Sequence, residues 1–322
     1  MYDVMTAGMD SIQHSLQQRR PPLSAVSDVD AARTRLASEM RAAGVRPGGV
    51  LLVHSALSSL GHVPGGADTV IDALLEALGP SGTLLLPTLS YLFVTETSPT
   101  FNVVTTPTNL GAIPAAALRR TGAVRSLHPT HSVAALGSRA TELTRDHYLD
   151  TTPVGEHSPF RLLRSVGGQV AFLGCGTRCN TSIHGVEELL PTPPPYLFRD
   201  ERITYDVTDA EGHMLSVSHK RHDFRDVAQR YERVVPLMPA GTRAVGRVGS
   251  AQMHVLDAAP MWDAALAALA ADASCFTEAV SGAAAENHYL VASSDARSWR
   301  YVVAAADASA PAASCVTIDA HS

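Results

Sequence analysis

Short apolar runs alternate with amphipathic segments along the first ninety residues. Apolar residues recur at helical spacing over 27–44 and over 67–78, and each of these stretches closes at a glycine. Two continuous apolar runs, 49–53 and 82–87, have the length of buried strands. An order of helix, strand, helix and strand predicts an α/β fold with a layered αβα core.

The pattern changes after the triple proline that ends at Pro195. Upstream of it, the sequence predicts one more helix and one more strand, over 113–120 and 133–137. Downstream, two runs around an Asp-Ala-Glu-Gly turn predict a β-hairpin, a second strand pair follows, and a helix comes last, over 203–207, 214–218, 242–248, 251–256 and 261–271. We therefore expect three regions, namely an N-terminal arm, one domain with a smaller β-rich C-terminal part, and an unassigned Ala- and Ser-rich tail, over 1–27, 28–280 and 281–322.

The most informative stretch follows another apolar run, 169–173, which ends at Gly174. This run predicts a buried strand closed by a glycine turn. A helix is expected to begin near Thr181 or Ser182 and to end before Pro191, because proline cannot continue a helix.

On that helix, His184 and Glu187 are three residues apart and His184 and Glu188 are four apart. Both spacings place side chains on one face. A histidine beside a carboxylate has the composition of a general base, because imidazole takes a proton near neutral pH and the carboxylate orients the ring. The same pair is also common on ordinary surface helices, so the spacing alone leaves both interpretations open.

Composition narrows the class of partner. The chain has 322 residues, 45% of them hydrophobic, and a net charge of −6. This balance argues against a nucleic-acid binder and suits a cationic small substrate. No apolar run approaches the roughly 20 residues of a membrane span, and residues 1–27 lack an apolar signal core, so we expect a cytoplasmic protein that binds no membrane. Cys175 and Cys179 fit neither a zinc ribbon nor a CxxC motif, which predicts small residues lining a turn.

Several other polar groups lie where predicted strands end. The His54-Ser55 pair and Ser58 leave the first strand, at an edge where ligands gather in open α/β sheets, although a capped turn would have the same sequence. Arg125 with Ser126 has the composition of a phosphate contact, or of a solvated arginine. Neither a G-x-S-x-G elbow nor a P-loop lysine motif is present in the sequence, which disfavours covalent catalysis.

Taken together, these stretches resemble the aminoglycoside N3-acetyltransferases. The resemblance begins with Leu-Val-His-Ser-Ala-Leu-Ser-Ser-Leu-Gly at 52–61 and the following Gly-Gly at 65–66. It continues through 82–88, 111–114 and 125–135, and reaches its catalytic signature in Asn-Thr-Ser-Ile-His-Gly-Val-Glu at 180–187. Ala56 departs from the pattern, because a serine is frequent there.

This resemblance implies the antibiotic N-acetyltransferase fold, distinct from the GNAT acetyltransferases. It also implies acetyl-CoA as donor and the 3-amino group of a 2-deoxystreptamine aminoglycoside as acceptor. Carried over by motif, His184 is the catalytic base and Glu187 its partner. The residues expected along the coenzyme are His54, Ser55, Ser58, Leu60, Gly61, Arg125, Ser126, His128 and His131.

We therefore expect direct acetyl transfer that needs no metal and confers antibiotic resistance, with the Thr181 hydroxyl or backbone amides steadying the oxyanion. Candidate acceptor-binding residues are Tyr91, Glu96, Asn180 and Glu188. The protein is expected to act as a monomer or homodimer. Three alternatives stay open, namely an acyltransferase of this fold acting on another amine, a non-catalytic binding module, and a zinc amidohydrolase that uses His54, His128, His131 and His184.

Overall fold

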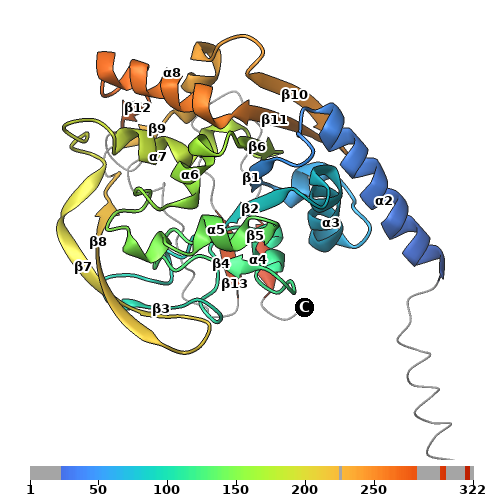
Figure 1. Ribbon diagram of the computed structural model, residues 1–322, viewed down its shortest axis with the longest axis horizontal. Coiled ribbons are helices and arrows are strands. Elements are labelled where there is room, and N and C mark those ends of the chain that lie inside the picture. Colours follow the sequence, from blue (N-terminus) through green and yellow to red (C-terminus); the bar gives the residue numbers. More distant parts are fainter. Residues whose placement is uncertain (1–22, 225–226, 281–297, 302–315, 320–322) are drawn as a thin grey trace, which may run out of the picture.

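The computed structural model describes residues 23–224, 227–280, 298–301 and 316–319 (Figure 1). Its centre is a seven-stranded sheet in the order β10-β11-β6-β1-β2-β5-β4. The three central strands β6, β1 and β2 are parallel, and the flanking strands pair in antiparallel fashion. The bounds are β1 (Val50–Ser55), β2 (Thr83–Pro87), β4 (Val124–Arg125), β5 (Val133–Gly137), β6 (Gln169–Leu173), β10 (Arg243–Val248) and β11 (Ala251–Asp257).

Helices cover both faces of this sheet. Alternate residues of β1 enter different cores, with Leu51 and Val53 in one and Val50 and Leu52 in the other. The first core is closed by α2 (Leu23–Ala42), α3 (Gly66–Leu78) and α4 (Ala112–Ala117). The second is closed by α5 (Ala140–Thr144), α6 (Pro159–Ser165), α7 (Ser182–Glu187) and α8 (Ala258–Ala271). The predicted layered α/β core is confirmed.

A smaller sheet curves along one side of the molecule (Figure 1). It consists of β3 (Thr100–Asn102), β7 (Phe198–Thr208) and β8 (Met214–His222), with the long β7–β8 hairpin at its edge. A small core of its own includes Phe101, Tyr205 and Val207. The predicted hairpin is confirmed and is longer than the two apolar runs that predicted it.

The remaining elements are short. The described segments contain four 3₁₀ helices, namely η1 (Leu57–Leu60), η2 (His147–Leu149), η3 (Thr177–Cys179) and η4 (Tyr231–Leu237). An antiparallel pair joins β9 (Val227–Gln229) to β12 (Thr277–Ala279), and a second joins β13 (Ser298–Tyr301) to β14 (Val316–Asp319). The second pair falls in the 281–322 segment, whose other residues lie outside the described part of the chain. Residues 1–22 of the expected arm also lie outside it.

Some boundaries differ from the predicted ones. Helix α2 begins at Leu23 rather than near residue 27, and α8 begins at Ala258 rather than 261.

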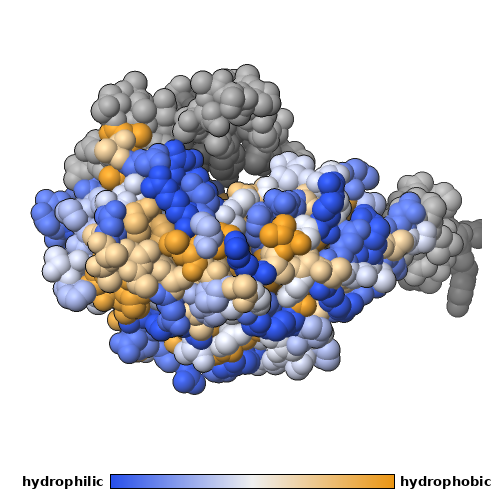
Figure 2. Space-filling model, turned by 90° about the horizontal axis from the view of Figure 1, so that it is seen from above, coloured by the Kyte–Doolittle hydropathy of each residue, from blue (hydrophilic) through white to orange (hydrophobic). Residues whose placement is uncertain are grey.

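The outer face of α8 is built largely of alanine, and in Figure 2 hydrophobic colours spread over the part of the surface where this helix lies. Within the described segments, no helix combines the length and apolarity needed to cross a membrane. The division of the chain into an arm, a domain and a tail remains a prediction.

Candidate active site

Helix α7 is held in the interior of the protein by its neighbours. All six of its residues are buried, although the helix ends at Glu187 and is shorter than predicted. It packs on α8, and a Cβ at Gly185 would lie 2.6 Å from side-chain atoms of both Trp262 and Val154. Only glycine leaves room for so close a contact, which fixes the position of the preceding residue, His184.

Two side chains meet at the imidazole of His184. Its Nδ1 atom lies 2.8 Å from the phenol oxygen of Tyr231 in η4 and 3.3 Å from Oε2 of Glu187. Tyr231 also donates to that carboxylate oxygen, at 3.2 Å. The predicted pair of His184 and Glu187 is therefore brought together, and the structure adds a phenol that contacts both members.

A second phenol holds the far side of the carboxylate. The hydroxyl of Tyr196 lies 3.0 Å from Oε1 of Glu187 and 2.9 Å from the carbonyl oxygen of Ala273. Glu187 is fully buried, so these donors replace the water that its charge would otherwise require. Burial and the charge of Glu187 raise the pKa of both tyrosines above that of an ordinary phenol, so both stay protonated donors.

Aromatic rings cover the outer side of the His184 imidazole. The ring of Phe224 stacks at 4.8 Å between centroids with an interplanar angle of 29°, and the ring of His222 lies at 4.4 Å. His184 keeps 7% of its surface exposed. In the described part of the chain, no hydrogen bond involves its Nε2 atom, so this nitrogen is the one available to a reacting group.

His222 belongs to a buried histidine cluster beside the site. Neighbouring imidazoles of the cluster lie 4.4 to 5.9 Å apart between centroids, in the sequence His184, His222, His131, His128 and then both His147 and His219. Burial lowers the pKa of His147 to about 3 and that of His219 to about 4. Burial also lowers the pKa of His128, His131 and His222 well below the ordinary value, so these five rings are neutral at pH 7.

The histidines proposed for a zinc site do not form one. Both nitrogens of His128 are in use, because Nδ1 accepts the backbone N–H groups of Thr130 and His131 and Nε2 lies 3.2 Å from the carbonyl oxygen of Thr152. Among the described residues, the only three potential ligands within 4.8 Å of one another are at the exposed β7–β8 turn, Asp209, Glu211 and His213. The geometry gives the zinc hypothesis no support.

The loop after β1 carries several groups expected to meet the coenzyme. Ser58 is exposed, and Gly61 is exposed with a φ of +76°, which favours glycine. His54 stacks on Phe172 at 5.2 Å, and burial lowers its pKa to about 3. Leu60, in contrast, is 2% exposed and packs in the core. Of the predicted coenzyme contacts in this loop, Leu60 has the least surface to offer.

Two buried polar atoms at the carboxyl end of β1, His54 Nε2 and Ser55 Oγ, have no hydrogen-bond partner among the described residues. Unpaired buried polar atoms are costly, and each calls for an explanation such as a bound ligand or water. This edge of the sheet is therefore suited to a ligand with its own amide and carbonyl groups.

Arg125 and Ser126 have structural partners. The Arg125 guanidinium donates to Ser132 Oγ at 2.9 Å and to backbone carbonyls of residues 88, 103 and 106, and it lies over the ring of Phe101. Ser126 Oγ accepts the N–H of Val133 and contacts His147. These contacts occupy donors on all three guanidinium nitrogens of Arg125. It therefore has no free pair of N–H groups to bind a phosphate, contrary to the expectation that it contacts the coenzyme.

The expected acceptor-binding residues are dispersed. Asn180 is fully buried, with Nδ2 3.0 Å from the sulfur of Met261, so it anchors the start of α7 instead of facing a substrate. Glu96 is exposed in the loop before β3. Tyr91 is half-buried, and its ring lies 6.2 Å from that of His131, which places it beside the histidine cluster.

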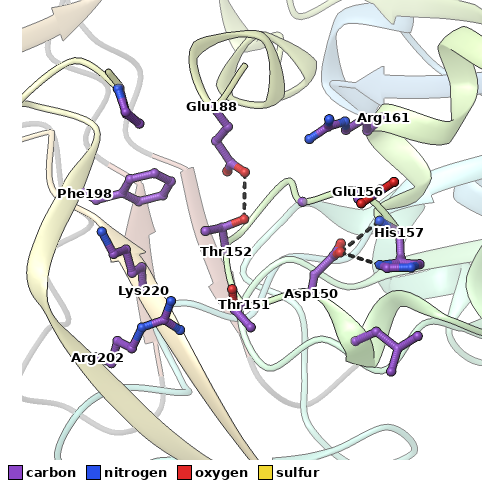
Figure 3. Close-up of a pocket in the computed structure, with 13 residues that line it drawn as sticks. Asp150, Thr151, Thr152, Glu156, His157, Arg161, Glu188, Phe198, Arg202 and Lys220 are labelled. Carbon is purple, nitrogen blue, oxygen red and sulfur yellow. Dashed lines mark hydrogen bonds and ion pairs between the residues drawn. The ribbon is translucent and has the colours of Figure 1, made fainter. Parts of the chain in front are cut away.

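Glu188 lines a cavity of about 470 Å³ beside α7 (Figure 3). Its carboxylate accepts the hydroxyl of Thr152 at 2.6 Å and the N–H of Val154 at 3.1 Å. Burial raises the pKa of Glu188 to about 7, which reduces its negative charge near neutral pH. The cavity is lined by three cations, Arg161, Arg202 and Lys220, and by the carboxyl groups of Asp150 and Glu156 besides Glu188. With its oxygens already bonded and its charge reduced, Glu188 is poorly suited to the acceptor-binding role expected of it.

The sequence could not have identified the aromatic residues of the site. Tyr231 is 47 residues from His184, and neither Tyr231 nor Tyr196 shares a spacing or motif with the His-x-x-Glu pair. Phe224 follows the end of β8, and only the course of the chain back across α7 brings it to the imidazole. The one available signal was the presence of two histidines near the end of the hairpin, His219 and His222.

Comparison with known proteins agrees with this geometry. The family model of the aminoglycoside 3-N-acetyltransferases matches residues 52–270. Aminoglycoside N(3)-acetyltransferase VII of Streptomyces paromomycinus is 32% identical over 274 residues, which cover 74% of this chain and 91% of that protein. Aminoglycoside N(3)-acetyltransferase IX of Micromonospora chalcea is 28% identical, with 73% and 92% covered.

Solved structures give the same result. A CoASH complex of AAC-IIIb superposes with a TM-score of 0.64 at 28% identity, covering 74% of this chain and 95% of that one. A histidine-to-alanine variant of aminoglycoside acetyltransferase AAC(3)-IVa, in complex with a gentamicin, also gives 0.64, at 27% identity with 76% and 90% covered. Fold and site thus define an acetyltransferase. The chain belongs to the aminoglycoside 3-N-acetyltransferase family, and the family and fold expected from the sequence are confirmed.

Proposed function

We propose that this protein transfers the acetyl group of acetyl-CoA to the 3-amino group of a 2-deoxystreptamine aminoglycoside, with His184 as general base. The observation that carries the proposal is the hydrogen-bonded group of His184, Tyr231 and Glu187 on a buried helix, with Nε2 of His184 left available. Relatives named for this reaction, and a related structure with CoASH, supply the substrate class.

Counting hydrogens supports one tautomer of His184. A carboxylate only accepts hydrogen bonds, so the Tyr231 hydroxyl donates to Glu187 and its oxygen can accept the Nδ1–H of His184. With the ring hydrogen on Nδ1, Nε2 carries the lone pair that a base requires. Glu187 then stabilises the imidazolium that forms, both directly and through the phenol.

The acetyl group moves directly from the coenzyme to the acceptor amine, without an acyl-enzyme intermediate. Nε2 of His184 removes a proton from the acceptor amine while the amine nitrogen attacks the thioester carbonyl carbon. The bond to sulfur breaks, and the leaving thiolate takes a proton from the imidazolium. The Thr181 hydroxyl, at the start of α7 and 8% exposed, is the candidate donor to the oxyanion.

The loop after β1 is the proposed coenzyme side. Ser58 and Gly61 are exposed there, and the buried Ser55 hydroxyl has no partner among the described residues. His54 and His131 lie close enough to His184 to share its electrostatic environment. These groups fit the amides of a pantetheine arm, which both donate and accept hydrogen bonds.

An acetylated amine loses its positive charge, which weakens attraction to RNA phosphates, and this loss would give antibiotic resistance. The experiment is a panel of aminoglycosides assayed for acetyl-CoA turnover, including matched compounds that lack a free 3-amino group. Turnover is expected only with a free 3-amino group. Turnover with an unrelated amine, and none with any aminoglycoside, would support instead an acyltransferase of the same fold with another acceptor.

A further inference from the structure

The turn between β6 and α7 brings two thiols into contact. The sulfur atoms of Cys175 and Cys179 lie 3.1 Å apart, with Cys179 exposed and Cys175 half-buried. A disulfide bond is about 2.05 Å long, so the two atoms need to approach by only about 1 Å. Gly176 between them has a φ of +69°, and this left-handed residue lets the turn fold back on itself.

The turn is tied to the active site on three sides. Ser59, in the loop after β1, donates to the carbonyl oxygen of Gly174 at 2.9 Å. Arg178 donates to the carbonyl oxygen of Gln229, next to η4 and its Tyr231. The carbonyl oxygen of Cys179 accepts the N–H of Thr181 at 3.0 Å. A shift of Cys179 is therefore transmitted to the first residues of α7.

We propose that Cys175 and Cys179 are a reversible dithiol–disulfide site whose closure displaces the start of α7 and slows the reaction. The sequence predicted only small residues lining a turn, because the spacing of the two cysteines is neither that of a zinc ribbon nor that of a CxxC redox motif. The contact between the sulfurs comes from the structure. The existence of the site is independent of the proposed function, whereas its effect on rate rests on the proposed function.

The reaction balances with a small disulfide such as oxidised glutathione as oxidant. The thiolate of Cys179, the more exposed cysteine, attacks one glutathione sulfur, and one glutathione leaves as a thiol. The thiolate of Cys175 then attacks the Cys179 sulfur and releases the second. Two protein thiols are oxidised and one small disulfide is reduced to two thiols. The hydrogen bond with Cys175 raises the pKa of the Cys179 thiol, so closure is expected to speed up as pH rises.

The test uses the full chain with Cys275 and Cys315 replaced by serine, so that only the pair remains. This protein is incubated with oxidised glutathione, and its intact mass and free thiols are measured, followed by acetyl transfer before and after dithiothreitol. We expect loss of both thiols with about 2 Da of mass, a fall in kcat of roughly tenfold to a hundredfold, and full recovery on reduction. The same protein with Cys179→Ser is the control, and incubation with oxidised glutathione should leave its kcat unchanged.

Two results would overturn the proposal in different ways. Thiols that stay free, or a mixed disulfide with glutathione that persists, would show that the pair cannot close. A closed disulfide with unchanged kcat would remove its effect on the active site. Mass and thiol measurements need no acetyl transfer, so an enzyme that fails to acetylate aminoglycosides would refute the proposed function and still leave the dithiol site tested.

Discussion

The phenol oxygen of Tyr231 lies 2.8 Å from Nδ1 of His184, closer than Oε2 of Glu187 at 3.3 Å. The nearest partner of the proposed base is therefore a tyrosine 47 residues away rather than the carboxylate on its own helix. This phenol connects the imidazole to the charge of Glu187 and holds the ring in one orientation.

Tyr231→Phe removes this connection without changing the shape of the core. A hydrogen bond to a charged group contributes about 1.5–3 kcal/mol, so kcat should fall roughly 10- to 150-fold while the KM for acetyl-CoA stays nearly constant. Tyr196→Phe is the matched control, because Tyr196 contacts Glu187 but not His184. Steady-state kinetics of both variants provide the measurement, and Tyr196→Phe should lose less kcat than Tyr231→Phe. A larger loss in Tyr196→Phe would contradict the role given to Tyr231.

Packing of α7 gives a second prediction. Gly185→Ala places a methyl group 2.6 Å from atoms of Trp262 and Val154, and such overpacking costs typically about 1–3 kcal/mol. The melting temperature should fall by several degrees, with a drop in kcat because His184 is the preceding residue. Gly111→Ala is the control, since nothing lies within 4 Å of a Cβ there and its φ is −58°. Equal melting temperatures for the two variants would contradict the packing argument.

The buried histidines make the fold acid-sensitive. Burial lowers the pKa of His54, His147 and His219 to about 3, 3 and 4 in the folded protein, whereas the unfolded value is near 6.5. The unfolded state thus binds more protons below about pH 6.5, so stability is complete above that pH and is lost as pH falls toward about 4. At pH 5, each of these neutral histidines lowers the free energy of unfolding by up to about 2 kcal/mol relative to pH 7.

Glu188 opposes this trend, because its raised pKa of about 7 favours the folded state at lower pH, but three histidines outweigh one carboxyl group. Denaturant unfolding at pH 7 and pH 5 measures the slope of the free energy of unfolding against pH. His219→Leu should make it shallower, since neither ring nitrogen of His219 has a hydrogen-bond partner among the described residues. His213→Leu on the exposed turn is the control. A slope that His219→Leu leaves unchanged would argue against the buried cluster as its source.

The structure gives different roles to two residues that the sequence placed at the coenzyme, Ser58 and Arg125. Ser58→Ala should raise the KM for acetyl-CoA severalfold with little change in stability, because Ser58 is exposed in the loop after β1. Arg125→Gln should lower the melting temperature, because its guanidinium holds backbone carbonyls of three different residues. Kinetic and thermal measurements on both variants decide between the roles. An Arg125→Gln protein of normal stability with a raised KM would restore Arg125 to the coenzyme site.

The sequence predicted what depends on local pattern. Continuous apolar runs located β1, β2 and β6, and the three-residue spacing placed His184 and Glu187 on one face. It could not predict contacts made across the fold. Tyr231 meets His184 only because η4 packs beside η3 and α8, and Asn180 turned out to be buried because α8 covers it. Arg125 has the residue type of a phosphate ligand, and only its neighbours reveal that its donors are already used.

The central claim is that His184 is the general base of acetyl transfer, and His184→Ala tests it most directly. The measurement is kcat/KM for acetylation of an aminoglycoside with a free 3-amino group, beside a calorimetric titration of the coenzyme into the same variant. We predict a loss of about 10²- to 10⁴-fold in kcat/KM with coenzyme binding nearly unchanged. Near-normal turnover in the variant would contradict the account and remove His184 from the mechanism.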